Sequence, residues 1–242
     1  MSKFDKRKRI NLFNGDSFEV LKDIPDNSID LVVIDPPYLF QDNGGGGAFG
    51  YKKKGYHTEL ENIKDGFDFT LLDSLERVMK KTNIYIFANK DLLFNLITHY
   101  KEKKKNLDLL TWTKTNPVPA CGNKYLSDTE YILFVREKGV KVYGEYKTKR
   151  KNYTSPLNIK DKNLYGHPTC KPVELLEKFI FNSSKEGEVV LDCFMGSGST
   201  GVACKNLKRK FVGIELDKEY FKICKSRIKK ASWNLPNDIS YL

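Results

Sequence analysis

The sequence predicts an α/β fold in a single domain. Short apolar runs rich in β-branched residues, typical of buried strands, alternate with longer segments in which apolar residues recur at helical spacing. Two of the short runs end in a carboxylate, because Leu31–Ile34 is followed by Asp35 and Val189–Leu191 is followed by Asp192. The chain is long enough for one sizeable core, and its apolar segments give no sign of a second. We therefore expect one α/β domain over residues 1–242.

Turn and capping residues separate the expected elements. Asn14-Gly15-Asp16 ends the first strand, Pro25 follows the first helix and Gly187 precedes a late strand. The expected strands are Ile10–Phe13, Leu31–Ile34, Asn83–Ala88, Leu107–Thr113, Glu130–Val135, Val189–Leu191 and Phe211–Ile214. The expected helices cover residues 17–22, 71–81, 91–100, 173–182, 199–207 and 218–230. The order strand, helix, strand recurs along the chain.

The first carboxylate stands in an informative local sequence, Asp35-Pro36-Pro37-Tyr38. Two consecutive prolines neither continue a strand ladder nor enter a helix interior, so they stiffen the exit of the strand and free the carbonyl of Pro36. An acceptor carboxylate, an acceptor carbonyl and the flat ring of Tyr38 together suit a planar amine such as a nucleobase amino group. An ordinary strand end followed by a turn is the alternative interpretation.

The second carboxylate precedes a glycine-rich turn in which Gly196, Gly198 and Gly201 are spaced as G-x-G-x-x-G. Glycines let the backbone approach a ligand closely, and the helix that begins at Ser199-Thr200 offers free N–H groups. Glu215, at the tip of the next strand, can accept both hydroxyls of a ribose. A dinucleotide fold needs a second βαβ half, for which too little chain follows, so a ligand with one adenosine and no pyrophosphate fits better.

The charge of the chain favours a polyanionic partner. Forty-two Lys and Arg residues against thirty-one Asp and Glu residues give a formal net charge of +11 at pH 7. Such a surplus favours nucleic acids through phosphate contacts and counterion release, although many basic soluble proteins bind none.

Cysteine and histidine usage argues against a metal site. The five cysteines show no Cys-x-x-Cys spacing and only three histidines are present, so we expect no metal and no disulfide framework. The basic stretch 3–9 leads into a strand-like segment rather than an apolar secretory core, and no apolar run is long enough to span a membrane. We expect a cytoplasmic protein with no membrane partner.

Three irregular segments are candidates for contact with nucleic acid. Residues 39–70, with four consecutive glycines and several lysines, are expected to form a mobile loop, either a lid or a solvated connection. Two prolines place Lys114 and Asn116 on a stiff loop at a strand end. Within 137–166, a small insertion expected to recognise the target, basic residues interleave with tyrosines. Its expected DNA contacts are Lys147, Lys149, Arg150 and Lys151, and a plain exposed hairpin is the alternative.

Together these motifs resemble a known family. Asp35-Pro36-Pro37-Tyr38 with Phe194-x-Gly196-x-Gly198 resembles the S-adenosylmethionine (SAM)-dependent DNA amino-methyltransferases, and the order of the two resembles the circularly permuted beta group. The other matching positions are Asn14-Gly15-Asp16, Lys114-x-Asn116-Pro117-x-Pro119, Glu130 and His167-Pro168-Thr169-x-Lys171-Pro172. The resemblance implies a Rossmann-like class I methyltransferase fold, with a seven-stranded, mostly parallel sheet and helices on both faces. The strands ending in Asp35 and Asp192 would then be neighbours, and the first strand would pair with Phe211–Ile214.

The resemblance also implies roles for individual residues. The catalytic tetrad would be Asp35, Pro36, Pro37 and Tyr38. The expected cofactor contacts are the methionine-side loop with Asp192, Phe194, Gly196, Gly198, Ser199 and Thr200, together with Glu215 for the ribose, Asp16 for the adenine and Lys171 for the carboxylate of SAM.

The implied activity is methyl transfer from SAM to the exocyclic N6 of a flipped-out adenine in double- or single-stranded DNA. Aspartate at the first tetrad position resembles the adenine enzymes, and cytosine N4 is the alternative target. A homodimer and a cognate restriction endonuclease would fit the family as partners. A nicotinamide-dependent oxidoreductase would leave the tetrad and the basic surface unexplained, and a non-catalytic nucleic-acid-binding protein would need a damaged tetrad or glycine turn. An RNA substrate stays open, since nothing in the sequence marks recognition of the sugar hydroxyl.

Overall fold

A computed structural model describes residues 4–37, 67–119, 121–165 and 170–231 of the chain. Tyr38, most of the expected mobile loop 39–70 and His167-Pro168-Thr169 lie outside these residues. The predictions made for them therefore stay predictions.

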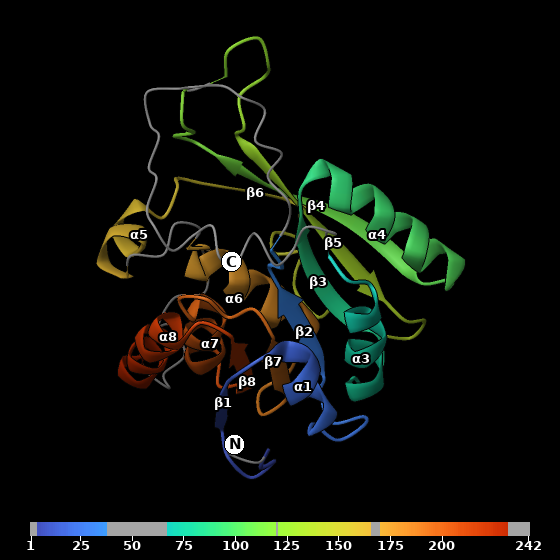
Figure 1. Ribbon diagram of the computed structural model, residues 1–242. Helices are drawn as coiled ribbons and strands as arrows, with labels where there is room; N and C mark the ends of the chain where they lie inside the picture. The colour runs from blue at the N-terminus through green and yellow to red at the C-terminus, as the bar shows by residue number, and fades with distance from the viewer. Residues whose placement is uncertain (1–3, 38–66, 120, 166–169, 232–242) are drawn as a thin grey trace.

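One mixed sheet forms the centre of the structure, with the strand order β1-β8-β7-β2-β3-β5-β4-β6 (Figure 1). All neighbouring strands are parallel except the pairs β3–β5 and β4–β5. The strands are β1 Ile10–Asn14, β2 Leu31–Ile34, β3 Asn83–Ala88, β4 Asn106–Lys114, β5 Thr129–Arg136, β6 Asn152–Ser155, β7 Val189–Asp192 and β8 Lys210–Glu215. The expected mostly parallel sheet is confirmed, but the expected number of strands, seven, is one too few.

The additional strand is β6, which lies inside the expected insertion 137–166. Its sequence has no apolar run, because it is an edge strand held mainly by the backbone of β4 and by polar side chains, with Tyr153 alone packing against the core. The indole Nε1 of Trp112 donates to Oγ of Ser155 at 2.9 Å, and the Asn152 amide donates to the Thr111 hydroxyl at 2.9 Å. Hydrophobic patterning alone cannot detect such a strand.

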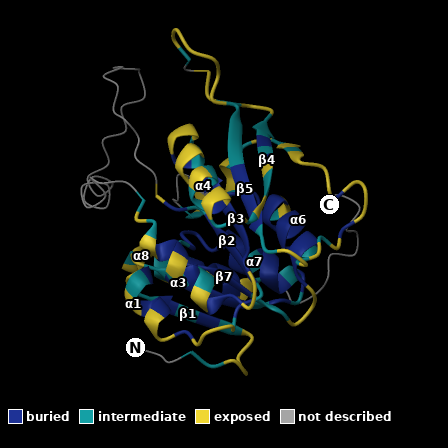
Figure 2. Ribbon diagram, turned by 90° about the vertical axis from the view of Figure 1, so that its right-hand side faces the viewer, coloured by how far each residue is buried: buried dark blue, intermediate teal, exposed yellow. Residues whose placement is uncertain are grey.

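Helices cover both faces of the sheet, as expected (Figure 2). They are α1 Ser17–Lys22, α3 Thr70–Val78, α4 Lys90–Glu102, α5 Ile159–Tyr165, α6 Val173–Ser183, α7 Ser199–Asn206 and α8 Lys218–Lys230. Along β2, Val32 and Ile34 pack in the core with α1, α3 and α4, whereas Leu31 and Val33 pack in the core with α6, α7 and α8. Because both faces of β2 are covered, its four residues are all buried. Within the described residues, the helices are all too short or too polar to cross a membrane.

Helix α3 ends at Val78, earlier than the expected end at Lys81. Met79 is already extended and forms a parallel bridge with Ile29, so the chain leaves the helix to pair beside the sheet. Helical spacing of apolar residues does not reveal this competing backbone pairing.

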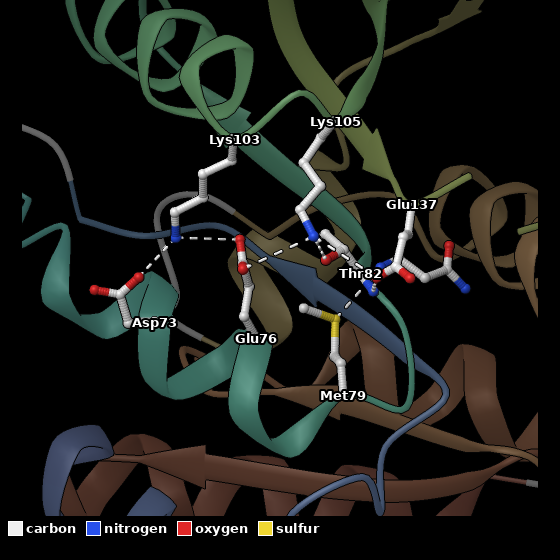
Figure 3. Close-up of polar contacts among 8 residues, drawn as sticks. Asp73, Glu76, Met79, Thr82, Lys103, Lys105 and Glu137 are labelled. Carbon is white, nitrogen blue, oxygen red and sulfur yellow. Dashed lines mark hydrogen bonds and ion pairs between the residues drawn. The ribbon is translucent and has the colours of Figure 1, made fainter.

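An ion-pair network joins α3 to the amino ends of β3 and β4 (Figure 3). The ammonium of Lys103 lies 2.7 Å from Asp73 and 3.4 Å from Glu76. The ammonium of Lys105 lies 3.9 Å from Glu76 and 3.6 Å from Glu137. Glu76 thus lies between two lysines and links the helix to the strands at the edge opposite the strand ends that carry Asp35 and Asp192.

We expect Glu76→Gln to lower the free energy of unfolding by about 1–2 kcal/mol, because two partly buried lysines each lose a carboxylate neighbour. Urea unfolding measures this change. Glu186→Gln is the matched control, since the side chain of Glu186 is 62% exposed and lies 4.0 Å from the ammonium of Lys208. Equal losses of unfolding free energy in both variants would contradict the stabilising role assigned to Glu76.

Candidate active site

The two carboxylates singled out by the sequence lie on neighbouring strands. β2 pairs in parallel with β7, with Leu31 opposite Val190 and Val32 opposite Leu191. Both strands therefore deliver their carboxylates, Asp35 and Asp192, to the same end of the sheet, which we call the carboxyl edge. The expected adjacency is confirmed. A pocket at this edge is lined by residues of both strands and of the glycine turn, among them Asp35, Lys171, Asp192, Phe194, Gly196, Ser199 and Thr200.

The glycine turn is held rigidly between β7 and α7. One oxygen of Asp192 accepts from the backbone N–H of Phe194 at 3.0 Å, and the other accepts from the Thr200 hydroxyl at 2.6 Å. Gly198 has a φ of +81°, and a β-carbon there would lie only 2.9 Å from Cβ of Cys224. Glycine is thus required at this position both for its conformation and for the close approach of α8. The turn is a preformed backbone surface that faces the pocket.

Glu215 and Asp16 mark a second part of the same edge. β1 and β8 pair in parallel with Asn14 opposite Glu215, which confirms that the first strand joins the last. The carboxylate of Glu215 accepts from the N–H of Gly196 at 2.8 Å and from the N–H of Asp217 at 2.9 Å. Asp16 caps α1 by accepting from the N–H of Phe18 at 2.8 Å. Glu215 is therefore directly bonded to the glycine turn, and Asp16 lies one strand further along.

Lys171 contacts the first carboxylate. Its ammonium lies 2.5 Å from Oδ2 of Asp35 and 3.4 Å from Oε2 of Glu130. Lys114, expected to contact DNA, instead lies 2.9 Å from Oε1 of Glu130, with a side chain only 13% exposed. Burial favours a higher pKa for the Glu130 carboxyl, but the charges of Lys171 and Lys114 hold that pKa below its ordinary value. Glu130, which the sequence marked only by its position in a motif, thus joins the two lysines beside Asp35.

The other expected DNA contacts lie apart from the pocket. The Asn116 side chain accepts from the N–H of Leu157 at 2.6 Å, so its oxygen joins two loops. The Thr148 hydroxyl donates to the side-chain oxygen of Asn182 at 2.9 Å, and the Asn182 amide donates to the carbonyl of Thr148 at 2.8 Å. These two bonds hold the segment around residue 148 on the end of α6. That end of α6 lies by the start of β3, where the Asn83 amide donates to the carbonyl of Ser183.

The basic residues of the insertion lie in the same region, away from the pocket. Lys147, Lys149, Arg150 and Lys151 are exposed along α6 and β4, toward the amino ends of the strands. Lys151 also lies 2.6 Å from Asp108 near the start of β4. The structure does not bring these four residues to the pocket, and their contact with DNA stays a prediction.

Arg227 is a site residue that the sequence did not single out. Its guanidinium donates to the Ser197 hydroxyl at 3.1 Å and to the Ser199 hydroxyl at 3.0 Å, both in the glycine turn. It also pairs with Asp161 of α5 and lies over the ring of Tyr165 at 4.4 Å. On a helix with many exposed lysines, nothing in the local sequence distinguishes this buried arginine from its neighbours.

Burial raises the pKa of Asp192 to about 7, and the nearby charges of Asp35 and Glu215 act in the same direction. The hydrogen bonds from Thr200 and Phe194 oppose this shift without cancelling it. Below about pH 7 Asp192 is therefore mostly neutral, which reduces the number of like charges at the carboxyl edge.

This shift predicts a pH-dependent stability. Between the ordinary pKa of aspartate and about 7 the folded chain holds a proton that the unfolded chain releases, so the contribution is present at low pH and is lost as pH rises toward 7. Relative to isosteric Asp192→Asn, the wild type should lose about 2 kcal/mol of unfolding free energy between about pH 5 and pH 8. Urea unfolding at both pH values checks this expectation, and parallel profiles for the two proteins would exclude it.

Comparison with known proteins identifies the family. Residues 29–226 match the sequence model of a family described as DNA methylase, N6/N4 type. The chain is 35% identical over 250 residues to the Type II methyltransferase M2.LlaDCHI of Lactococcus lactis subsp. cremoris, covering 95% of this chain and 92% of that protein. It is 34% identical over 247 residues to the Type II methyltransferase M2.DpnII of Streptococcus pneumoniae, covering 93% of this chain and 91% of that protein.

Solved structures agree with this result. The crystal structure of the M1.HpyAVI-SAM complex superposes with a TM-score of 0.70 at 28% identity, covering 90% of this chain and 98% of that chain. The PvuII DNA methyltransferase, described as cytosine-N4-specific, has a TM-score of 0.70 at 19% identity over 97% of this chain and 89% of its own, and shares the fold. The family match includes Asp35, Asp192 and the glycine turn, and the alignment to a relative covers 95% of the chain. The chain therefore belongs to the N6/N4 family of DNA methylases.

Proposed function

We propose that this protein transfers a methyl group from SAM to the exocyclic N6 of an adenine flipped out of DNA. The observation that carries the proposal is the placement of Asp35 and the glycine turn on the adjacent strands β2 and β7, around one pocket. Such a placement puts a methyl acceptor and a methyl donor side by side at the point where strands from the two halves of the sheet meet.

The residues around the pocket fit SAM. The turn presents backbone rather than large side chains at Gly196 and Gly198, and α7 begins directly after it. On the resemblance to the family, we assign Glu215 to the ribose hydroxyls, Asp16 to the adenine and Lys171 to the carboxylate of SAM. The solved relative described as the M1.HpyAVI-SAM complex, 28% identical over 90% of this chain, supports this cofactor. SAM supplies an electrophilic methyl group on a sulfonium.

Asp35 and the carbonyl of Pro36 act on the acceptor. A target amine that donates its two hydrogens to these oxygens has its nitrogen lone pair drawn out of conjugation with the ring, which favours in-line attack. Positioning of this kind supplies much of the acceleration. As the nitrogen gains the methyl group and the sulfonium becomes a thioether, the amine becomes far more acidic, so the carboxylate of Asp35 can take its proton without being a strong base. Tyr38, outside the described residues, is proposed to stack on the flipped base, because extrusion from the duplex exposes the face of the base.

Adenine is proposed as the target because an aspartate stands at the first position of Asp35-Pro36-Pro37-Tyr38. The chain's surplus of positive charge supports DNA binding through phosphates. A homodimer and a cognate restriction endonuclease are proposed as partners on the resemblance to the family alone.

The central test is transfer of labelled methyl from SAM to unmethylated DNA by the wild type and by Asp35→Asn. We expect the variant to lose at least about 100-fold in single-turnover rate, because the amine loses an anionic acceptor, and to change its affinity for SAM by less than about threefold. Asp108→Asn, far from the pocket, is the matched control and should keep the wild-type rate. Equal loss of SAM binding and methyl transfer in Asp35→Asn would contradict the assigned role.

Mass analysis of nucleosides from the treated DNA identifies the target atom. N6-methyladenine that is absent after treatment with Asp35→Asn supports the proposal. N4-methylcytosine in its place would mean that cytosine is the target base and that the same mechanism acts on its amino group.

A second prediction concerns Arg227, which holds the glycine turn through Ser197 and Ser199. Arg227→Met should weaken SAM binding about tenfold, since the turn loses the two charge-assisted hydrogen bonds that hold the hydroxyls of Ser197 and Ser199. Lys225→Met, an exposed position on the same helix, is the control. Titration of each folded variant with SAM measures the effect, and equal affinities for the two variants would exclude a role for Arg227 in shaping the turn.

A further inference from the structure

Four alternating charges form a row along the carboxyl edge, which we call the edge network: Asp35, Lys171, Glu130 and Lys114. The successive separations are 2.5 Å, 3.4 Å and 2.9 Å. The four side chains come from the end of β2, the segment before α6, the start of β5 and the end of β4. Charges of opposite sign thus continue from the proposed catalytic carboxylate across three further elements.

Burial makes this row sensitive to the loss of any member. The side chains of Lys171 and Lys114 are 7% and 13% exposed, and that of Glu130 is 24% exposed. A charge that is withdrawn from water to this degree is strongly destabilised when its partner is removed. The pKa of Glu130 lies below its ordinary value because its two lysine neighbours outweigh its burial, so Glu130 is an anion at neutral pH.

Glu130 is anchored on one side only. Its Oε1 lies 2.9 Å from Lys114, within hydrogen-bond distance, whereas its Oε2 faces the more distant Lys171 at 3.4 Å. Lys171 packs over the ring of Phe87 with its ammonium 4.9 Å from the ring centre. Both carboxylates thus lie within 3.4 Å of this ammonium, so only a short displacement separates its pairing with Asp35 from pairing with Glu130.

Such a movement would favour the proposed reaction. Oδ2 of Asp35 is engaged by Lys171 at 2.5 Å, and a carboxylate oxygen in a close ion pair is a poorer acceptor for a weakly polar amine. Lys171 and the target amino group therefore share one carboxylate, whose other oxygen also accepts. Because the ammonium of Lys171 has three donors, it can bind Glu130 together with the proposed carboxylate of SAM once it leaves Asp35.

We propose that Glu130 is a positioning residue that acts through Lys171: it accepts the ammonium when the target amine reaches Asp35, and Lys114 holds Glu130 in place for this exchange. This inference rests on the proposed function of the site. It assigns the Lys114 and Glu130 pair, which touches neither the base nor the methyl group, to the control of the acceptor carboxylate.

The test is Glu130→Gln, which keeps the shape of the side chain and removes its charge. We expect its single-turnover methyl-transfer rate to fall at least about tenfold, because Lys171 loses the charged carboxylate that would draw its ammonium away from Asp35. Its affinity for SAM in the absence of DNA should not weaken by more than about threefold, since Lys171 itself is unchanged. A purely structural role would lower stability and SAM affinity together with the rate.

Glu137→Gln is the matched control. Glu137 follows the other end of β5 and lies 3.6 Å from Lys105 in the network of Figure 3, so the same substitution breaks an ion pair of the same kind far from the pocket. It should keep the wild-type rate. Glu130→Asp retains the charge and should recover most of the rate lost in Glu130→Gln.

Lys114→Met provides a second test that does not depend on Glu130→Gln folding. It should slow the reaction without weakening SAM binding, because Glu130 is no longer held. In the double variant Lys114→Met with Glu130→Gln, the edge network has the same net charge as in the wild type. We nevertheless expect this variant to be as slow as Glu130→Gln. Rescue of the rate by the double variant would overturn the proposal in favour of simple charge balance.

The outcomes separate the two levels of inference. A wild type that transfers no methyl to DNA contradicts the proposed function itself. An active wild type with unchanged rates in Glu130→Gln and Lys114→Met overturns only the role of the edge network.

Discussion

The parallel pairing of β2 with β7 is the constraint on which the rest of the structure depends. It brings Asp35 and Asp192 to one edge, and the buried charges there must be compensated by other parts of the chain. Lys171 pairs with Asp35, and Asp192 receives hydrogen bonds from both ends of the glycine turn. The same pairing buries Asp192 near Asp35 and Glu215, which raises the pKa of Asp192. The protonated carboxyl adds no further negative charge at this edge.

The glycine turn illustrates how the surrounding elements preorganise a binding surface. Its backbone is fixed by Asp192 from within, by Glu215 from the next strand, and by Arg227 of α8, which donates to the carbonyl of Ser197. Arg227 also pairs with Asp161, so α5 in the insertion is connected to the turn through a single guanidinium. Groups held in place before a ligand arrives need no reorganisation on binding, which favours both affinity and positioning.

The sequence predicted the central strands and most helices because their apolar patterning is strong. The bounds expected for Leu31–Ile34, Asn83–Ala88 and Lys218–Lys230 agree with the structure. β6 was missed because edge pairing depends on a neighbour's backbone rather than on apolar side chains. The turn was found because glycine spacing is a local signal, and the adjacency of its strand to β2 followed only from the resemblance to a family.

Charged side chains were harder to place from sequence. Lys114 and Lys147 look alike in the sequence, yet Lys114 is largely buried against Glu130 while Lys147 is exposed along α6. Arg227 likewise differs from its exposed neighbours only in its position on the helix. Whether a lysine or arginine contacts solvent, a ligand or a buried acid is decided by tertiary packing, which local patterns do not encode.

The order of the strands has a consequence for how the chain folds. β2 is made early and β7 late, and Val189 and Asp30, which a hydrogen bond joins, are 159 residues apart. Until β7 is synthesised, one edge of an entirely apolar strand has no partner. Long-range parallel pairing is slow to form, and open apolar edges associate with other chains. A nascent chain of this protein is therefore expected to depend on chaperones until β7 has closed the centre of the sheet.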